Sequence, residues 1–381
     1  MIKTFSLRLY PNSAQTRMLS NHFGAARWVY NRSLERKAAV YREIGKNLSW
    51  VDLCKEITTL KRNQETVWLN EVTTAPLQAS VRNLNYAFQK FFKKQSGFPA
   101  FKRRHGRQSF QYPVDVKVDF TTQKVYLPRI GWVRYHDPRT FDGKIKTVTI
   151  VRSATGKHYA QVLIEFPHEM PMQKPLDRSR AIGVDVGLLT FATLSDGRKV
   201  ANPRFLKLAM RDLRHANRRV SRKQKCSSNR AKARLKLALV HERVANRRKD
   251  FLHKLTTSMV NESQVDAWVV ETLNVKGMSH MRNLARSIHD ASWSEFIRQL
   301  EYKSAWRGKH VVKIGRFMPS SKTCSCGVVN DGLRLGDRMW TCEACGITHD
   351  RDVLAAQNIL RFANINTEGN PGINASGQAA S

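Results

Sequence analysis

Four cysteines near the end of the sequence constrain the fold of this chain more than any other feature. They lie within 22 positions, as a C-x-C pair followed by a C-x-x-C pair: Cys324, Cys326, Cys342 and Cys345. Two thiolate pairs at this spacing hold one Zn²⁺ tetrahedrally in a zinc ribbon, which leaves no open position for chemistry. We therefore expect a structural Zn²⁺ site rather than disulfides, with four unrelated free thiols as the alternative interpretation.

The two turns that carry these cysteines differ in length. Gly327 and Gly346 follow the two pairs and suit tight turns that aim backbone N–H groups at sulfur. The first pair is one residue shorter than the second. This difference predicts a strained first turn and an ion that is held more weakly or differently there.

Three acidic residues occupy positions that suggest a second metal site. Asp185 lies inside the apolar run AIGVDVGLL, Glu271 ends the apolar run AWVVE, and Asp352 follows Asp350 at the start of a helical pattern. Taken singly, Glu271 is explained as a strand end and Asp350 as a helix cap. A buried charge without a partner is costly, so Asp185 needs one. Together, Asp185, Glu271 and Asp352 form an arrangement that gathers carboxylates around divalent metal ions, and a pair of hard cations can activate water for phosphodiester cleavage.

Two glycines flank the first of these acids. Gly183 and Gly187 lie two residues before and after Asp185. We interpret them as positions where the backbone passes close to substrate or metal.

The charge of the chain indicates a polyanionic partner. There are 66 Lys and Arg against 30 Asp and Glu, a formal net charge of +36. Nucleic acid is the usual polyanion inside a cell, and a membrane-surface protein or a merely basic enzyme are the alternatives. No apolar run approaches about 18 residues, and the first residues lack the pattern of a signal peptide. We expect a cytoplasmic protein that binds nucleic acid and no membrane, with an affinity that falls steeply with salt.

The basic charge is densest between residues 204 and 254, which hold 18 Lys and Arg against three acids. Leucines and valines recur there at helical spacing, which predicts a long helical hairpin that turns near 225–232. A run of charge is usually a solvated face, but in a chain of this net charge we interpret it as a nucleic-acid surface.

The pattern of the sequence changes along the chain. Residues 3–10 alternate like a strand, helical patterns continue to a basic break at 96–108, and residues 110–167 have the pattern of short strands. These strands predict a small β-barrel-like unit that includes the first strand, with the helices inserted. The composition of 367–381 is that of a disordered tail.

Several motifs resemble TnpB, the OrfB-type protein of bacterial insertion sequences. They are GVDVGLLTFATLSDG, VVETLNVKGM, PSSKTCSCG with WTCEACGITHDRDVLAAQNIL, RRKDFLHKLTT, LRLYPNSAQ and GAARWVYNRSL, and they span nearly the whole chain. The resemblance implies an α/β fold with a RuvC-like, RNase H-type nuclease domain that contains an inserted zinc ribbon. It also implies an N-terminal β-barrel wedge domain with an inserted helical recognition domain.

The resemblance sets expected domain boundaries. They are 1–10 and 106–178 for the wedge domain, 11–105 for the helical recognition domain, 179–319 and 351–366 for the nuclease domain, 320–350 for the zinc ribbon, and 367–381 for the tail.

By the same resemblance, the expected function is that of a transposon-encoded, RNA-guided DNA endonuclease related to type V CRISPR effectors. Asp185, Glu271 and Asp352 match the catalytic triad and would hold two Mg²⁺ ions. The partners are a guide RNA from the transposon end and double-stranded target DNA, cut beside a short adjacent motif in the bacterial cytoplasm by a monomer or weak dimer. Base pairing with the guide would set the target sequence. The alternatives are a guide-dependent DNA-binding regulator with weak or lost cleavage, a transposase that joins DNA ends, and a transposase accessory protein.

Candidate nucleic-acid contacts come from two regions. Trp50, Thr74 and Gln78 lie where family members contact the adjacent motif, and ordinary helix or loop residues are the alternative interpretation. The basic hairpin supplies the other candidates, which are Arg218, Arg219, Arg222, Lys223, Arg247 and Arg248. Aromatic residues among the lysines after residue 90 could stack on bases, although Phe91 and Phe92 are better explained as core residues.

The sequence departs from the family pattern at two places. The family motif D-R-D-x-N-A-A has Leu354 where Asn is expected, and the first cysteine pair is C-x-C. If that Asn supports the acidic turn, its loss lowers activity. The departures leave a decayed or partly active copy as an alternative, although all three acids are retained.

Overall fold

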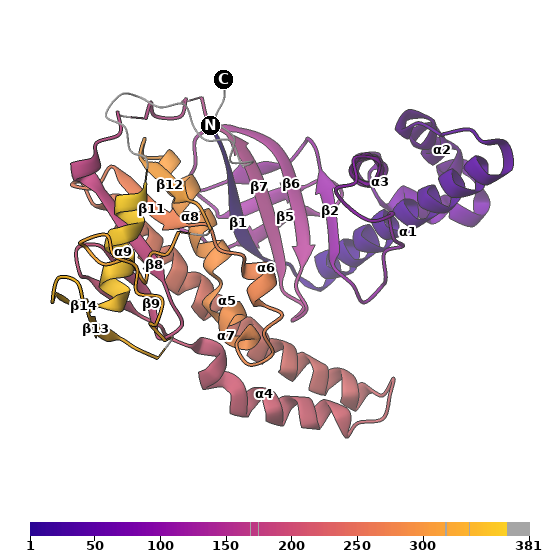
Figure 1. The fold of residues 1–381 in the computed structure, drawn as a ribbon. Helices are drawn as coiled ribbons and strands as arrows, with labels where there is room; N and C mark the ends of the chain where they lie inside the picture. The colour runs from indigo at the N-terminus through magenta and orange to yellow at the C-terminus, as the bar shows by residue number, and fades with distance from the viewer. Residues whose placement is uncertain (168, 174, 317, 335, 364–381) are drawn as a thin grey trace. The chain divides into compact units, whose positions relative to one another are not determined.

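A computed structural model describes residues 1–167, 169–173, 175–316, 318–334 and 336–363. The chain divides into two units, Met1–Glu169 and Met170–Ser381, and each is described by itself (Figure 1). The predicted tail at 367–381 lies outside the described residues. No described helix is both long enough and apolar enough to cross a membrane.

The helices of the first unit lie between its first two strands, as the sequence predicts. They are α1 (Ser13–Ile44), α2 (Trp50–Arg62), the 3-10 helix η1 (Gln64–Glu71) and α3 (Thr74–Phe92). Asn12 and Gln15 form a capping box at the start of α1, and Gly45 ends the helix in the left-handed conformation, with φ of 64°. An apolar core of their own joins the helices, and its members include Val29, Leu53, Ile57, Leu69, Leu77 and Val81.

A seven-stranded antiparallel sheet completes the first unit. Its strands are β1 (Ile2–Tyr10), β2 (Gln108–Tyr112), β3 (Lys117–Asp119), β4 (Lys124–Leu127), β5 (Gly131–Tyr135), β6 (Lys144–Arg152) and β7 (His158–Glu165), in the order β2-β6-β7-β1-β5-β4-β3. Alternate residues of these strands enter one core, as Leu7, Val125, Val133, Val148 and Val162 do. The β-rich unit and its use of the first strand are as predicted, whereas the hydrogen-bonded order has β2 and β3 as open edges.

The second unit contains a five-stranded mixed sheet. Its strands are β8 (Ala181–Val186), β9 (Thr190–Leu194), β10 (Lys199–Ala201), β11 (Ala267–Glu271) and β12 (His310–Ile314), in the order β10-β9-β8-β11-β12. β8, β11 and β12 run parallel, and β9 and β10 are antiparallel additions. Parallel neighbours require long crossover connections, which here contain helices.

Helices cover both faces of this sheet. The α-helices of the second unit are α4 (Phe205–Ser221), α5 (Ser228–Asn261), α6 (Val275–Met278), α7 (Ala285–Ala291), α8 (Trp293–Ala305) and α9 (Arg351–Phe362). The core on one face combines strand residues with α5, α7 and α8, for example Leu252, Ile288 and Phe296. The core on the other face includes Ile359 and Ala363 at the end of α9. α4 and α5 form the predicted hairpin, and Figure 1 shows its turn extending away from the sheet.

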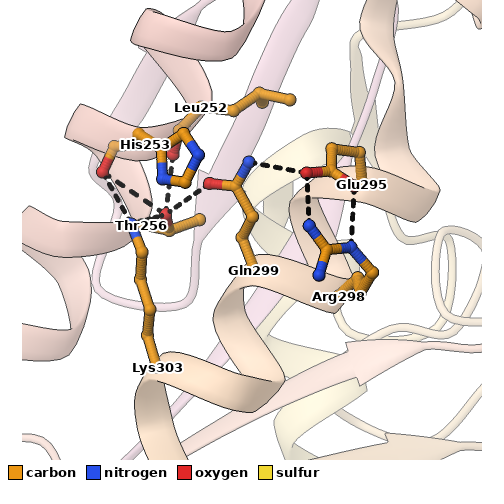
Figure 2. Close-up of polar contacts among 7 residues, drawn as sticks. All are labelled: Leu252, His253, Thr256, Glu295, Arg298, Gln299 and Lys303. Carbon is orange, nitrogen blue, oxygen red and sulfur yellow. Dashed lines mark hydrogen bonds and ion pairs between the residues drawn. The ribbon is translucent and has the colours of Figure 1, made fainter. Parts of the chain in front are cut away.

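A partly buried polar network joins α5 to α8 (Figure 2). Lys303 Nζ donates to the carbonyl oxygen of His253 at 2.8 Å and to Thr256 Oγ1 at 2.7 Å. Thr256 Oγ1 also donates to Gln299 Oε1 at 3.1 Å, and Gln299 Nε2 donates to Glu295 Oε1 at 2.9 Å. Burial lowers the pKa of Lys303 to about 8. The network therefore fixes α8 to α5, and the burial of Lys303 disfavours the charged form of this lysine.

Lys303→Met should change how stability depends on pH. The pKa of Lys303 in the folded chain, about 8, lies below the value of about 10.4 for an unfolded lysine. Between these pH values the unfolded state binds more protons, so the folded state gains stability as pH rises. We expect the melting temperature of the wild type to rise relative to that of the variant between about pH 8 and pH 10.

Lys249→Met is the control for that measurement, because Lys249 lies exposed on the same helix, α5. Its melting temperature should follow that of the wild type across the range. A wild type that loses stability relative to Lys303→Met over this interval would refute the assignment.

Candidate functional site

Two acids follow the last paired residues of two neighbouring parallel strands. Val184 of β8 pairs with Val270 of β11 at the end of their common register. Asp185 and Glu271 are the next residues on the two strands. Because the carboxyl ends of parallel strands meet at one edge of a sheet, these two side chains are neighbours there.

Gly183 allows α9 to lie directly on β8. A Cβ at this position would lie 2.0 Å from the carbonyl oxygen of Ala356 and 3.0 Å from the backbone nitrogen of Leu360. Asp185 lies two residues further on the same face of β8, and Asp352 lies one helical turn before Ala356. The glycine therefore places α9 where its first turn reaches Asp185. The close approach is to a helix of the chain itself, so the interpretation of Gly183 as a contact with substrate or metal is wrong.

The electrostatics of Asp185 reflect this crowding. Burial, the charge of Asp352 and the charge of Glu271 raise the pKa of Asp185 to about 7, against smaller opposing effects of Arg351 and the backbone N–H of Val186. Burial also raises the pKa of Glu271. Within the described ranges, no residue forms an ion pair with Asp185. Asp185 therefore lies among like charges at this edge of the sheet, without an ion-pair partner among the described residues. The three acids offer carboxylate oxygens, which are the ligands that Mg²⁺ prefers.

Asp350 and Asp352, at the start of α9, both have cationic partners. Asp350 Oδ1 accepts from the N–H groups of Asp352 and Val353 at 3.0 and 3.2 Å, and Asp350 Oδ2 lies 2.6 Å from Lys199 Nζ. Burial favours neutral Asp350, but Lys199 and the two N–H groups outweigh it and lower the pKa of Asp350. Arg338 Nη1 lies 3.0 Å from Asp352 Oδ1. Asp350 is therefore the helix cap, as predicted, whereas Lys199 and Arg338 carry no signal in the sequence.

The four cysteine sulfur atoms converge on one point. They all lie within 4.8 Å of one another, with 3.5 Å between Cys324 and Cys345 and 3.7 Å between Cys326 and Cys342. A tetrahedral ion with Zn–S bonds of about 2.3 Å requires about 3.8 Å between sulfurs. The cysteines therefore fit Zn²⁺. In the part of the chain that the structure describes, no second group of three or more His, Cys, Asp or Glu side chains is as tightly gathered.

The shorter first turn closes with a hydrogen bond that spans one residue fewer than that of the second turn. The N–H of Gly327 donates to the carbonyl oxygen of Cys324 at 3.0 Å, three residues back, whereas the N–H of Gly346 donates to that of Cys342 at 2.8 Å, four residues back. Both glycines have positive φ, 98° and 70°. The tighter turn accommodates the missing residue and the sulfurs still converge. Weaker binding of the ion stays a prediction.

Buried side chains fix α9 to the ribbon, whose two strands are β13 (Met339–Thr341) and β14 (Thr348–Asp350). Leu354 is 2% exposed and packs with Trp340 and Cys342. One turn further, Asn358 Nδ2 donates to the carbonyl oxygen of Thr323 at 2.6 Å. The leucine that departs from the family pattern thus belongs to the core that joins the ribbon to the helix of the third acid. Its effect on activity stays a prediction.

Cys342→Ser should release the metal and loosen α9, because Zn²⁺ binding supplies much of the folding free energy of a small ribbon. We expect the zinc content of the purified chain, measured by atomic emission, to fall from about one ion per chain to near zero. The melting temperature should fall with it. Cys226→Ser, at an exposed cysteine outside the ribbon, should change neither value. Full zinc content in Cys342→Ser would rule out this cysteine as a ligand.

The predicted DNA contacts of the first unit lie on two helices. Thr74 and Gln78 are one turn apart on α3, and Gln78 is exposed. Thr74 Oγ1 accepts from Lys61 Nζ at 3.1 Å. Trp50 begins α2 and is 42% exposed. The structure brings Thr74 and Gln78 together on one face, and contact of these three residues with DNA stays a prediction.

The basic candidates of the hairpin have different environments. Four are exposed at the end of α4 and in the turn after it, namely Arg218, Arg219, Arg222 and Lys223. Arg247 is exposed on α5 and lines a pocket of about 560 Å³ together with Phe205 and Phe251. Arg248 Nη2 instead lies 2.8 Å from Asp290 Oδ1 on α7. Arg248 therefore joins the hairpin to α7, and its contact with nucleic acid stays a prediction.

The aromatic residues at the end of α3 differ from the expectation. Phe92 is 66% exposed, so its interpretation as a core residue is wrong. The ring centroids of Phe91 and Phe98 lie 5.4 Å apart, edge to face, and Phe98 is 56% exposed. These rings pack on one another at the surface, because the basic break that follows α3 leaves them uncovered.

Three family models match the chain. They are described as "Probable transposase" over residues 161–282, "Cas12f1-like, TNB domain" over residues 293–359, and "Helix-turn-helix domain" over residues 1–46. In the structure, residues 1–46 form β1 and the single long helix α1. The first two matches cover both groups of acids and the cysteines.

Relatives that match over most of their own length extend these matches. A Streptomyces pristinaespiralis protein named "Putative RNA-guided DNA endonuclease" is 39% identical over 94% of this chain and 88% of its own length. The Escherichia coli K12 protein named "Putative RNA-guided DNA endonuclease InsQ" is 33% identical over 94% of this chain and 92% of its own. "TnpB-like protein L79" of Acanthamoeba polyphaga mimivirus is 22% identical over 94% and 73%.

The fold is similar to that of a solved structure. It is that of a Cas12f1–sgRNA–target DNA complex, with a TM-score of 0.56 at 13% identity over 94% of this chain and 98% of that one. The sequence motifs, the family models and the full-length relatives agree. The chain belongs to the TnpB family, the OrfB-type proteins of insertion sequences.

Proposed function

We propose that this chain is an RNA-guided DNA endonuclease with Asp185, Glu271 and Asp352 as its catalytic acids. The observation that carries the proposal is the gathering of these carboxylates where β8, β11 and α9 meet, in a chain of net charge +36. A protein that only binds nucleic acid gains nothing from carboxylates beside a polyanion, unless they hold cations. The printed names of the two bacterial relatives and the fold shared with a guide-RNA and DNA complex support it.

The donor set suits Mg²⁺, because each of the three acids offers carboxylate oxygens. When bound, paired Mg²⁺ ions lower the pKa of water and stabilise the leaving oxygen in phosphodiester hydrolysis. The chain supplies the placement: the strands fix Asp185 and Glu271, and Gly183 brings α9 with Asp352 to them. Lys199 pairs with Asp350 and Arg338 pairs with Asp352, so these two cations lie at the start of α9.

The finer domain division also remains part of this proposal. Three parallel strands with two antiparallel additions, and acids on two strands and one helix start, support an RNase H-type nuclease domain. The ribbon lies in the chain between β12 and α9, and so interrupts that domain. The first unit would contain the wedge and the inserted helical recognition domain. Contacts of the helical residues Trp50, Thr74 and Gln78 with the adjacent DNA motif belong to the same proposal.

The test is to co-express the chain with its flanking DNA, sequence the RNA that co-purifies, and present a plasmid library that carries the matching target. We expect one discrete RNA species and linear plasmid only when target, RNA and Mg²⁺ are all present, with one short motif enriched beside the cut. Cutting that needs no guide would overturn the proposal. Guide-dependent binding of the matched target without cutting would identify a regulator instead.

A further inference from the structure

In the sheet of the first unit, which Figure 1 shows as a ribbon, the strands β1, β5 and β4 are neighbours. They carry an unusual set of side chains on the face opposite the core. Along these strands, Leu9, Val133 and Val125 are buried in the core. Successive strand residues point to opposite faces, so the residues between the buried ones point outward. Those outward residues form the aromatic–basic face, which consists of Arg8, Tyr10, Lys124, Tyr126, Trp132 and Arg134.

The register arranges these side chains in two rows. In one row Tyr10 lies opposite Arg134, and Arg134 lies opposite Lys124. In the other row Trp132 lies opposite Tyr126, with ring centroids 5.4 Å apart. The Arg8 guanidinium lies 4.9 Å from the centroid of the Tyr10 ring. Each ring therefore has a cation or a second ring beside it, and the pairing of β1 with β5 joins residues that are far apart in the sequence.

Both rows are accessible. Tyr10 is 46% exposed and Trp132 is 45% exposed. The acid nearest to the rows by register is Asp119, opposite Lys124, and its Oδ1 already accepts from the backbone N–H of Thr121 at 2.9 Å. The face is thus positively charged with open aromatic surface between the charges.

This combination favours one kind of occupant. Rings that stack on bases, with cations that hold the neighbouring phosphates, bind single-stranded nucleic acid without strict sequence preference. Paired bases hide their π-faces inside a duplex and leave only phosphates and groove edges to a flat protein surface. In a chain of net charge +36, the cations between the rings favour a polyanion over a protein or a neutral lipid surface.

We propose that the aromatic–basic face binds unpaired bases of RNA by stacking on Tyr10, Tyr126 and Trp132. The inference rests on the proposed function, in which the partner is a guide RNA. It adds the surface that binds the guide RNA, and it specifies that this surface binds a single-stranded segment of the guide. Arg8, Lys124 and Arg134 contact the phosphates of that segment.

The test compares two labelled RNA probes by fluorescence anisotropy, using the full chain freed of bound nucleic acid at high salt. One probe is a single-stranded RNA of mixed sequence, and the other is the same RNA in a duplex. Stacking contributes about 1–3 kcal/mol per base, so Tyr126→Ala with Trp132→Ala should weaken single-strand binding at least about tenfold. Binding of the duplex should change less than about twofold, because duplex binding uses phosphate contacts.

Two control variants make the result specific. Tyr126→Phe with Trp132→Phe keeps the rings and should bind the single strand like the wild type. Tyr41→Ala with Tyr86→Ala removes two rings of the first unit that are 64% and 54% exposed but lie on helices, and should also bind normally. Unchanged single-strand affinity in the Tyr126/Trp132 alanine variant overturns the proposal. So does an equal loss for single strand and duplex, or an equal loss in the Tyr41/Tyr86 variant.

Failure of this inference can be distinguished from failure of the proposed function. A chain that loses single-strand binding in the Tyr126/Trp132 variant but never cuts a matched target keeps the inference and rejects the endonuclease. If the chain cuts matched DNA but the Tyr126/Trp132 variant binds the single strand like the wild type, the endonuclease is kept and the inference is rejected.

Discussion

Asp185→Asn should abolish guided DNA cleavage while leaving RNA binding intact. The amide has nearly the shape of the carboxylate but carries no charge, so the site loses the acid that the other two surround. We expect single-turnover cleavage of a matched target to slow by at least about 10³-fold, which corresponds to about 4 kcal/mol of transition-state stabilisation. The melting temperature of the metal-free chain should rise, because the substitution removes a confined charge that lies beside two like charges.

The control for this substitution is Asp212→Asn. Asp212 is an exposed acid on α4 in the same unit, and its replacement adds the same net charge. The control should cleave like the wild type, and both variants should bind the same amount of RNA. Cleavage by Asp185→Asn within tenfold of the wild-type rate would contradict the assignment of this acid.

Gly183→Ala should destabilise the second unit and abolish cleavage with it. The new Cβ would lie 2.0 Å from the carbonyl oxygen of Ala356, a backbone atom that cannot move without α9. Overpacking typically costs about 1–3 kcal/mol, and a contact with backbone places this variant at the upper end of that range. Displacement of α9 also moves Asp352 away from Asp185. Thermal denaturation should therefore give a melting temperature well below that of the wild type, and the cleavage rate of the folded fraction should fall sharply.

Gly315→Ala is the matched control for the Gly183 variant. Gly315 follows β12 in the same unit, and a Cβ there would meet nothing within 4 Å. Its stability should stay within about 0.5 kcal/mol of the wild type. If Gly183→Ala has the same melting temperature as the control and cuts DNA at the wild-type rate, the position of α9 does not depend on close contact with β8.

The sequence predicts the elements of the second unit well, because local patterns specify them. The apolar runs around Asp185 and before Glu271 are strands, and the basic segment is a helical hairpin. The cysteine spacing predicts the convergence of the four sulfurs, since a ribbon depends on short turns. The position of α9 could not be predicted, because the reason for a glycine at position 183 is its close contact with Ala356, which only the structure shows.

Partners that are distant in the sequence could not be predicted. Arg338 reaches Asp352 from the ribbon, and Arg248 reaches Asp290 from another helix, because tertiary packing rather than spacing brings them together. The same reason hides the aromatic–basic face, whose rows exist only in the register of β1, β5 and β4. The interpretation of Phe92 as a core residue is wrong for the same reason, because burial depends on tertiary packing and this ring is 66% exposed.

The central claim is that acids from two strands and one helix form a single site for divalent cations. Its most direct test is anomalous diffraction from crystals of the guide-loaded chain in which Mn²⁺ replaces Mg²⁺. We predict a Mn²⁺ peak within about 2.0–2.3 Å of a carboxylate oxygen of Asp185 and of Glu271 or Asp352. Mn²⁺ peaks confined to other parts of the chain, at a concentration that supports cleavage, would contradict the claim.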